Sequence, residues 1–476
     1  MPDRYSVASP YRAAGRSRAS AAVRTNWRLW LSGGLLTVAI VFGGGGSPSP
    51  STELVVELAA IAAIVAWVWL VGRDPAYPQP PIDRPLFIMA GLFVAIPVLQ
   101  LIPLPPAIWH HLPGREIEIQ ALALVDRADA WMPFSESPPR TIASALSLIP
   151  PIAMLFMVSR LRGRDRTTLI GVLAALGLVA AVVGVFQLAS GNAHWFRFYE
   201  FTHYGFETGF QANRNADADV LLIAAMALTA WATAEGRIER SRQMQVLVAA
   251  MLLFLALSIV LTGSRTGVAL IVVAIAASAA MSFHRRMLKQ WRIAVAIAIG
   301  LAVVGTSGYF LMNNARVQRT LARFDQGEAI RPEIWKDTVY AIGQHWPAGS
   351  GVGTFQPIFN AAERLEFVRP DFSNRAHNDY LEFTLEAGLV APVFLVAALV
   401  FALLRIRKML VGNTSRDKQI RGIFVIGSVM VFALHSVVDY PMRSLSLGVV
   451  CGLLAGLLGV SGGLDRGVVG SEGVED

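Results

Sequence analysis

The chain has 476 residues, of which 54% are hydrophobic and only 16% are Asp, Glu, Lys or Arg. Soluble domains usually carry about 25% charged residues, so this composition excludes an ordinary soluble enzyme. The formal net charge is +8 at pH 7, but Lys and Arg lie mainly in short connections between apolar runs, where they set topology and contact membrane lipids. We therefore expect no nucleic-acid partner.

Apolar runs of about 17 to 24 residues recur along the chain, and each can cross a hydrocarbon core of about 30 Å. They predict an all-α polytopic membrane protein with about twelve transmembrane helices. The expected spans lie near residues 29–42, 53–71, 86–104, 141–159, 168–189, 219–235, 245–262, 267–283, 291–312, 379–404, 422–440 and 444–461. The single cysteine, Cys451, lies inside an apolar run, which excludes an intramolecular disulfide and a Cys-rich metal site.

The basic connections orient these spans, because Lys and Arg are preferentially retained on the cytoplasmic side. The resulting organisation is a cytoplasmic basic tail at 1–26, spans one to nine within 27–312, an outer loop subdomain at 313–376, spans ten to twelve within 377–461, and a cytoplasmic tail at 462–476. The largest outer loop therefore connects spans nine and ten.

The first span admits a second interpretation. A basic leader, the apolar run at 29–42 and the small residues of 43–47 also fit a signal peptide. Cleavage would leave the new amino terminus outside, so every later span would keep its orientation. We interpret this segment as a retained span.

Two outer segments are longer than connections usually are. Residues 105–140 are expected to form a short interfacial element, to which we assign no chemistry. Residues 313–376 form the largest polar segment, with expected helices around 331–345 and 355–367 on either side of the Gly-rich loop 347–353. We expect this segment to cover a cavity in the membrane domain.

Ionisable side chains at the outer ends of spans are costly to bury unless they pair or line a cavity, so they mark candidate functional positions. The segment 209–217 carries Arg214 between two Asn residues that suit a turn and a helix cap. The turn 262–267 carries Arg265 among glycines and hydroxyls, whose free backbone N–H groups would suit a phosphate. The structural alternatives are a capped helix start and an arginine that extends to the lipid headgroups.

Two further groups lie beside the large outer loop. Arg331 begins an expected helix, where it can bind an anion at the helix amino terminus or pair with Glu333. His377 lies at the outer end of the tenth predicted span. Several carboxylates follow it, and burying an ionised carboxylate there without a partner is energetically unfavourable. The polar residues that follow it are Asn378, Asp379, Glu382 and Glu386. Because these polar and acidic residues surround it in the sequence, we interpret His377 as functional.

A smaller group closes the eleventh span. Asp439 and Arg443 lie four residues apart and are candidates to pair, although Pro441 interrupts a continuous helix. His435 lies one turn before Asp439. Either His435 or Asp439 is a candidate to orient another side chain in an outer cavity.

Together these motifs resemble the superfamily of O-antigen ligases and O-antigen polymerases, which are glycosyltransferases of the bacterial envelope. The resemblance covers roughly residues 141–461. It is carried by Phe-x-x-Asn-Arg-Asn at 210–215, Gly-Ser-Arg-Thr-Gly at 263–267, Arg-x-x-Ile-Trp at 331–335, His-Asn-Asp-Tyr-Leu at 377–381, Glu-x-Gly at 386–388, and His-Ser-x-x-Asp-Tyr-Pro at 435–441.

The resemblance implies an inner-membrane enzyme that moves a glycan from an undecaprenyl diphosphate carrier to an acceptor hydroxyl at the periplasmic face. The acceptor is lipid A core for a ligase and a growing glycan for a polymerase. By resemblance, His377 is catalytic, and Arg265 and Arg331 bind the donor diphosphate. Arg214 is a further donor-site candidate that departs from the family pattern, which often has Pro there. The supporting residues implied are Asn378, Asp379, Glu382, Glu386, His435 and Asp439.

The chemistry required of such a site agrees with these residue types. A glycosyl diphosphate already has a good leaving group, so the protein must stabilise its developing charge and position the acceptor hydroxyl. Arginines perform the first task, and an imidazole, with an ordinary pKa of about 6.5, can act as general base for the second. Direct displacement inverts the anomeric configuration. The sequence shows no His/Cys cluster, so we expect neither a metal nor another cofactor.

Other functions are also compatible with parts of this pattern. A ligase and a polymerase share the donor chemistry and differ in the groove that receives the acceptor, and the long-loop motifs favour a ligase. A flippase or other transporter of lipid-linked sugars would also have about twelve helices, but it should show repeat symmetry and polar groups near the membrane midplane. Here the ionisable residues gather at the outer ends of the spans. A membrane scaffold leaves the carboxylates after His377 unexplained.

Overall fold

The computed structural model describes residues 27–45, 50–73, 80–192, 194–200, 202–238, 241–282, 331–368, 373–411 and 414–460. The predicted ninth span, the two predicted tails and the first part of the large outer loop lie outside the described residues. The described helices begin with Trp27 and end with Leu457.

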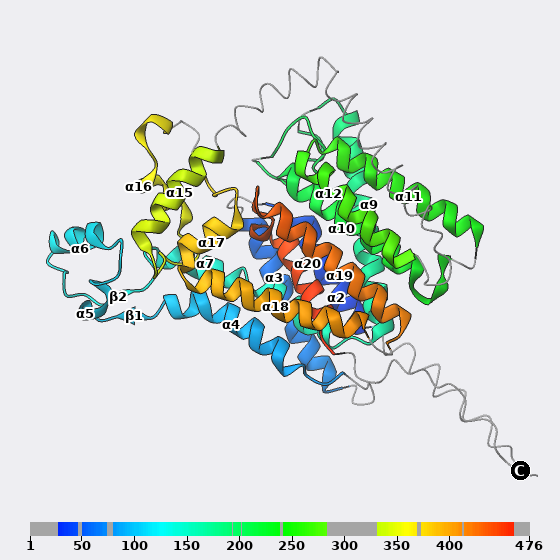
Figure 1. Ribbon diagram of the computed structural model, residues 1–476, viewed down its shortest axis with the longest axis horizontal. Coiled ribbons are helices and arrows are strands. Elements are labelled where there is room, and N and C mark those ends of the chain that lie inside the picture. Colours follow the sequence, from blue (N-terminus) through cyan, green and yellow to red (C-terminus); the bar gives the residue numbers. More distant parts are fainter. Residues whose placement is uncertain are drawn as a thin grey trace, which may run out of the picture.

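The described chain is almost entirely helical (Figure 1). Its α-helices are α2 (Trp27–Phe42), α3 (Pro50–Val71), α4 (Arg84–Gln100), α5 (Pro106–Trp109), α6 (Glu116–Ala123), α7 (Pro138–Leu146), α8 (Ile149–Ser159), α9 (Gly163–Ala189), α10 (Arg214–Thr233), α11 (Arg242–Leu261), α12 (Arg265–Ser282), α15 (Arg331–His345), α16 (Phe355–Ala362), α17 (Asp379–Ala387), α18 (Val390–Leu410), α19 (Arg416–His435) and α20 (Leu445–Leu457). Short 3₁₀ turns are η1 (Ala234–Gly236), η3 (Leu365–Phe367) and η4 (Pro441–Arg443). Two short strands, β1 (Pro103–Leu104) and β2 (Met132–Pro133), pair antiparallel with Pro103 opposite Pro133.

Eight described helices are long and apolar enough to cross a membrane, and three shorter apolar helices accompany them. The eight are Ser51–Val71, Pro138–Ser159, Gly163–Ala189, Arg214–Gly236, Arg242–Leu261, Arg265–Ser282, Val390–Leu410 and Arg416–His435; the shorter ones are Trp27–Phe42, Arg84–Gln100 and Leu445–Leu457. The prediction of an all-α polytopic membrane protein is therefore confirmed. The count of twelve spans stays a prediction.

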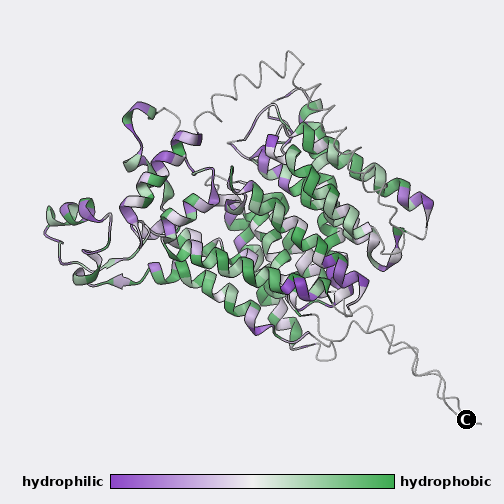
Figure 2. Cartoon of the chain, in the orientation of Figure 1, coloured by the Kyte–Doolittle hydropathy of each residue, from purple (hydrophilic) through white to green (hydrophobic). Residues whose placement is uncertain are grey.

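Helix α10 lies at the centre of the bundle. It packs against α9, α11, α12 and α19, and 94% of the residues in its apolar stretch are buried. In α18 the corresponding share is only 11%. Figure 2 shows both helices as mainly hydrophobic along their middle. A helix that is apolar all round is buried either in protein or in lipid, so α10 is the protein core and α18 presents its surface to the membrane.

Helix α2, the segment that also fitted a signal peptide, packs into the bundle against α3, α8, α9 and α20. Its carboxyl end is attached to two distant loops by backbone hydrogen bonds. Gly43 accepts from the N–H of Ser446 at 2.9 Å, and Gly44 accepts from the N–H of Ala212 at 2.9 Å. A Cβ atom at position 44 would lie 2.4 Å from the carbonyl oxygen of Phe210. The close approach of these loops therefore requires glycine at position 44.

The tenth predicted span, at 379–404, is not one continuous helix. It is divided at Gly388, where φ is +55°, so that α17 precedes the membrane-spanning α18. A Cβ at Gly388 would lie 2.1 Å from the carbonyl oxygen of Pro347. The predicted Gly-rich loop fills this break, because Ser350 and Gly351 donate their N–H groups to the carbonyls of α17. The prediction missed the break because an apolar run does not reveal a packed loop at its end.

The helices expected between the ninth and tenth predicted spans are present in the described residues, which we call the outer subdomain after that prediction. The stretch expected at 331–345 is α15, and the stretch expected at 355–367 forms α16 and η3. Trp335 of α15 donates its indole N–H to the carbonyl of Ala376 at 3.1 Å. This hydrogen bond holds α15 against the residue that immediately precedes His377.

Candidate active site

His377 lies at the junction between the outer subdomain and the membrane domain. Its backbone has φ +50°, an uncommon conformation for a residue other than glycine. The next residue, Asn378, caps α17 by accepting the N–H groups of Tyr380 and Leu381 at 3.0 Å. The Asn378 amide also donates to the carbonyl of Val437 at 2.9 Å. The cap therefore joins the two outer loops that carry the candidate residues.

The imidazole of His377 meets a carboxylate from the loop after α19. Its Nδ1 lies 3.2 Å from Oδ1 of Asp439, and its ring packs edge-on against Tyr440 with 5.0 Å between ring centroids. The second oxygen of Asp439 accepts a hydrogen bond from the side-chain amide of Asn215 in α10. The side chain of His377 is 27% exposed and that of Asp439 only 3%. Asp439 is thus fixed inside the protein, while the imidazole reaches the surface.

Asp439 is held in its ionised form. Burial by itself raises the pKa of this carboxyl group. The hydrogen bond and charge of His377 oppose burial, and the charges of His435 and Arg331 add to them, so that the pKa lies well below its ordinary value. An ionised Asp439 favours a proton on Nδ1 of His377, which leaves Nε2 as the nitrogen that can accept a proton.

A buried ionic network holds these loops in place. Arg443 in η4 lies 2.7 Å from Oε2 of Glu386 and 3.3 Å from Oε1 of Glu382. Its Nε is 3.9 Å from Asp379. Arg375 contacts Glu382 at 3.0 Å. The predicted pairing of Asp439 with Arg443 is therefore wrong, because η4 turns Arg443 toward α17 and Asp439 toward His377.

Two of the predicted supporting residues act through backbone groups. Glu382 accepts the N–H of Ala376 at 2.9 Å. Asp379 accepts the hydroxyl of Ser436 at 2.8 Å and the N–H of Met442 at 3.2 Å. These contacts fix the backbone on both sides of His377 and its partner loop, which is a positioning role.

Arg331 lies close enough to the His377 pair for its charge to act on Asp439. Its predicted alternative partner, Glu333, instead binds Lys336 at 2.9 Å and Arg364 at 2.6 Å. Within the described part of the chain, no hydrogen bond or ion pair engages the Arg331 guanidinium. It is the first described residue of α15, and the amino terminus of a helix favours an anion.

Arg214 begins α10, after Asn213, whose side chain caps the helix by accepting the N–H of Asn215 at 2.8 Å. Its guanidinium lies 4.4 Å from the ring centre of Phe206, and its backbone N–H lies 3.3 Å from Nδ1 of His203. The ionisable groups of Arg214, His377, Asp439 and Arg331 all act electrostatically on His203. His203 therefore lies near residues of four predicted segments.

The turn that carries Arg265 adjoins the same region. A Cβ atom at Gly263 would touch the Phe206 ring at 2.5 Å, with Arg214 Nη1 at 3.5 Å. The expectation of free backbone N–H groups is wrong for three positions. Gly263 donates to a carbonyl of α11, and Ser264 and Gly267 donate to the side-chain oxygens of Thr262 and Ser264. These three N–H groups are therefore not offered to an anion, and the exposed Arg265 side chain is the cationic group of this turn.

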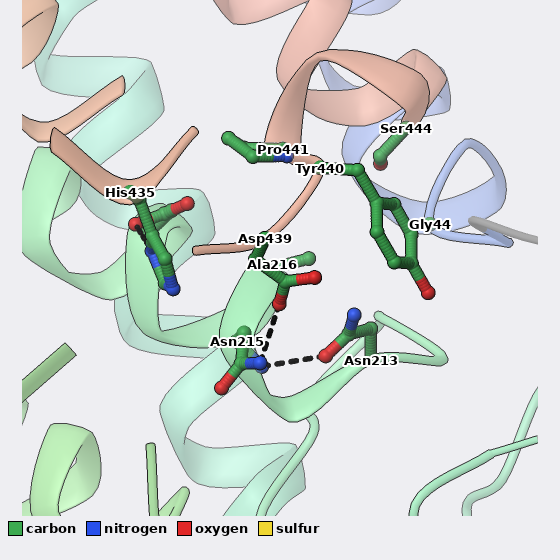
Figure 3. Close-up of a pocket in the computed structure, with 10 residues that line it drawn as sticks. Gly44, Asn213, Asn215, Ala216, His435, Asp439, Tyr440, Pro441 and Ser444 are labelled. Carbon is green, nitrogen blue, oxygen red and sulfur yellow. Dashed lines mark hydrogen bonds and ion pairs between the residues drawn. The ribbon is translucent and has the colours of Figure 1, made fainter. Parts of the chain in front are cut away.

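His435 belongs to a second, deeper pair. Its Nδ1 lies 2.7 Å from Oδ1 of Asp219 in α10, and both side chains are 1% exposed. A cavity of about 10 Å³ is lined by this pair and by Asp439, and Figure 3 shows His435 and Asp439 among the residues around it. Its lining residues are Gly44, Asn213, Asn215, Ala216, Asp219, His435, Asp439, Tyr440, Pro441 and Ser444. A volume of this size admits about one water molecule, so His435 is not placed to meet a glycan.

Four residues at this site were not among the predicted site residues. Asn215 binds Asp439, Asp219 binds His435, Arg443 binds the carboxylates of α17, and His203 accepts the backbone N–H of Arg214. The signal that pointed to Asn215 and Asp219 was the polar start of an otherwise apolar span. Nothing local distinguished His203 from a loop histidine.

The fold and the site together define the class of membrane protein to which the chain is similar. This is a polytopic membrane protein in which the half-exposed pair of His377 and Asp439 and the buried ionic network of Arg443 lie at the same end of the helix bundle. Residues 249–396 match the family model described as O-Antigen ligase. The match confirms the predicted resemblance to the O-antigen ligase superfamily and supports a membrane glycosyltransferase of ligase or polymerase type. Among curated proteins, no match to this sequence was found.

The matched region contains part of the site. Arg265, Arg331 and His377 lie within it, as do the carboxylates of α17. Arg214 and Asp439 lie outside it and join the site only through the fold.

Proposed function

We propose that this protein transfers a glycan from an undecaprenyl diphosphate carrier to an acceptor hydroxyl at the periplasmic face of the inner membrane. The preferred acceptor is lipid A core, as in an O-antigen ligase. The observation that carries the proposal is the half-exposed imidazole of His377, oriented by the buried, ionised Asp439. The charge of Arg331, whose guanidinium pairs with no described residue, acts on the same pair. The family match from 249 to 396 supports the same class of reaction.

The proposed step is a direct displacement at the anomeric carbon. The acceptor oxygen attacks that carbon while the bond to the diphosphate oxygen breaks, and the bonding electrons leave with the diphosphate. Nε2 of His377 accepts the proton of the acceptor hydroxyl. Asp439 stabilises the imidazolium that results, since it already binds the Nδ1 side of the ring. The product has the inverted anomeric configuration.

Arg331 and Arg265 are assigned to the departing diphosphate. Negative charge grows on the leaving group as the glycosidic bond breaks, and a guanidinium aimed at that charge stabilises the transition state more than the ground state. Arg331 has the better support, because its charge reaches Asp439 and because the amino terminus of α15 adds to its positive potential. Arg214 is assigned to the wall of this region, packed on Phe206.

Envelope glycans distinguish a ligase from a polymerase. Cells expressing the wild-type protein and His377→Ala at matched membrane levels are compared for lipid A core and for the undecaprenyl-linked pool. Long undecaprenyl-linked chains with bare core support the ligase. Carriers bearing a single repeat indicate the polymerase instead. Wild-type levels in both pools would overturn the catalytic assignment of His377.

The reaction is proposed to proceed without a divalent metal. The purified protein, supplied with lipid-linked donor and acceptor, is assayed in excess chelator and after addition of magnesium or manganese. Transfer should continue in the chelator. Strict loss of transfer that magnesium or manganese restores would contradict this part of the proposal.

A further inference from the structure

A second cavity lies at the opposite end of the bundle from His377. It has a volume of about 260 Å³ and is lined by Arg166, Arg405, Lys408, Met409, Lys418, Arg421, Leu457, Leu458, Gly459 and Val460. The lining comes from the start of α9, the end of α18, the start of α19 and the end of α20. Since α19 has 20 residues and a helix rises about 1.5 Å per residue, about 30 Å separates this cavity from the His435 end.

Five of the lining residues are cationic, and none of those in the described chain is acidic. Arg166 has a structural role, because its guanidinium donates to the carbonyls of Val158, Leu161, Ser159 and Gly459. Arg405 pairs with Asp83. These contacts close the ends of α8 and α20 and fix the back of the cavity. Asp83 also accepts the N–H of the lining residue Val460 at 3.0 Å, so its carboxylate offsets the charge of Arg405 at the edge of the cavity.

Two lysines contribute positive charge that no described carboxylate pairs. Lys408 and Lys418 line the cavity, and neither has a hydrogen-bond or ion partner within the described ranges. The neighbouring carboxylate, Asp417, is directed elsewhere, where it accepts the N–H of Glu235 at 3.0 Å. Two lysines that no described carboxylate pairs favour an anion with delocalised charge, such as a phosphate.

The surroundings indicate which kind of phosphate fits. Met409, Leu457 and Leu458 bring apolar surface to the same cavity. The outward side of α18 continues this apolar surface toward the middle of the membrane, with Leu399, Val400, Leu403 and Leu404 each about half exposed. A free phosphate gains nothing from contact with such a surface, whereas the acyl chains of a phospholipid bury apolar area against it.

We propose that this cavity, named the basic pocket, binds the phosphate headgroup of an anionic glycerophospholipid, with its acyl chains lying along α18. The bound lipid would join α9, α18, α19 and α20 at the end of the bundle remote from His377. The site is separate from the proposed glycan transfer and does not depend on it.

A segment of the chain itself is the competing occupant. Residues 461–476 follow Val460 directly and carry Asp465, Glu472, Glu475 and Asp476 against one arginine. Their carboxylates could neutralise the same lysines. The continuous apolar surface beside the pocket favours the lipid, and removal of this segment separates the two occupants.

The test measures lipid retention by native mass spectrometry on the full chain purified in a neutral detergent. Dioleoyl phosphatidylglycerol and dioleoyl phosphatidylcholine are added in parallel. The wild-type protein should retain phosphatidylglycerol at least tenfold more than phosphatidylcholine, and the double variant Lys408→Gln/Lys418→Gln should retain about tenfold less phosphatidylglycerol than the wild type. Equal retention of both lipids by the wild type, or undiminished retention by the double variant, would overturn the proposal.

The matched control is Arg242→Gln/Arg407→Gln, which removes the same charge from exposed positions near this end of the bundle that do not line the basic pocket. Its phosphatidylglycerol retention should stay within twofold of the wild type, and both double variants should melt at the wild-type temperature in detergent without added lipid. Equal loss in both double variants would show a general charge effect and reject the pocket.

Two further arms identify the occupant. Millimolar inorganic phosphate should leave lipid retention unchanged, and displacement of the lipid at that concentration would indicate a site for free phosphate. A chain lacking residues 463–476 should retain as much phosphatidylglycerol as the full chain. Lipid binding that appears only after this truncation would show that the acidic segment occupies the pocket.

Discussion

Two histidine–aspartate pairs lie at the same end of the bundle and differ in what surrounds them. His377 and Asp439 are 3.2 Å apart, and the imidazole is 27% exposed. His435 and Asp219 are 2.7 Å apart, and both side chains are 1% exposed. The same two residue types therefore form one pair that can meet a substrate and one that is sealed between α10 and α19.

The difference comes from the backbone that carries each histidine. His435 is the last residue of α19 and packs against α10, so its position follows from helix packing. His377 stands outside any helix, at φ +50°, held between the cap of α17 and the outer subdomain. An active-site side chain needs both a fixed position and access, and the loop junction provides both.

Removing each histidine in turn should separate the two pairs most clearly. His377→Ala should lower glycan transfer by about 10³- to 10⁴-fold, the effect of losing a general base, with unchanged thermal stability. His435→Ala should instead lower stability, because it leaves Asp219 buried without its partner. Activity per folded molecule and melting temperature, measured on both purified variants, distinguish the roles. Equal changes in activity and in melting temperature for the two variants would contradict the proposed difference between a catalytic and a structural pair.

Removing the arginine that supports the exposed pair should have the next largest effect. Arg443→Gln leaves Glu382 and Glu386 buried without their shared cation, and breaking a buried ion pair from one side costs about 3–5 kcal/mol of stability. The melting temperature should fall strongly. Arg443→Gln combined with Glu386→Gln should recover part of the loss, since it removes one of the unpaired charges. Unchanged stability of the single variant would show that the network is dispensable.

The orientation of His377 can be tested without changing its surroundings. Asp439→Asn keeps the shape but replaces an acceptor by a group that can donate, which favours the wrong tautomer of His377. Transfer should fall by about 10²-fold with little change in substrate affinity. The matching change at the sealed pair, Asp219→Asn, should leave kcat of the folded enzyme within a few fold of wild type.

The proposed donor contacts are tested by replacing arginine with lysine, which keeps the positive charge but removes the bidentate geometry of the guanidinium. Arg331→Lys and Arg265→Lys should each lower transfer about tenfold, the worth of one hydrogen bond to a charged group. The matched control is Arg127→Lys, since Arg127 is an exposed arginine of the segment 105–140. This variant should keep the transfer activity of the wild type. Full activity in the first two purified variants would remove these arginines from the donor site.

A third histidine–carboxylate pair extends the comparison to the outer subdomain and predicts the smallest effect. His345 of α15 lies 3.1 Å from Glu136. Burial lowers the pKa of His345 and Arg115 also opposes its charge, but the hydrogen bond and charge of Glu136 raise the pKa above its ordinary value. The folded state therefore binds the proton more tightly than the unfolded state does. The stabilisation is complete below about pH 6.5 and is lost as the pH rises through the folded-state pKa.

Hydrogen exchange checks this dependence in α15. Protection of its amides should be higher at pH 6 than at pH 8.5, after correction for the intrinsic exchange rate. His345→Gln should remove the difference between the two pH values, while amides of α10 should show none in either protein. A dependence that persists in His345→Gln would assign it to another group.

The sequence predicted much of the fold because membrane spans are a local property. A run of apolar residues must satisfy its own backbone as a helix wherever it crosses lipid, so eleven apolar helices were found near the expected positions among the described residues. Helix α15 was also found where its pattern placed it. The break at Gly388 was missed because its cause is the loop at Pro347, which lies outside the apolar run.

The sequence also identified the residue types of the site but not their partners. Asn215 and Asp439 are 224 residues apart in the chain, and Arg443 binds Glu386 rather than its near neighbour Asp439. Sequence spacing predicts contacts only within one helix or turn, whereas these contacts join three separate segments. His203 was overlooked for the same reason.

The order of residues was enough to establish a helical membrane protein whose ionisable residues gather at the ends of its spans, since each property follows from the local cost of placing polar groups in lipid. It could not establish which histidine is exposed, which carboxylate holds it or where the basic pocket lies. The first two features depend on how α10, α17 and α19 pack, and the basic pocket depends on how α9, α18, α19 and α20 pack. Both arrangements are fixed by contacts between residues distant in the chain.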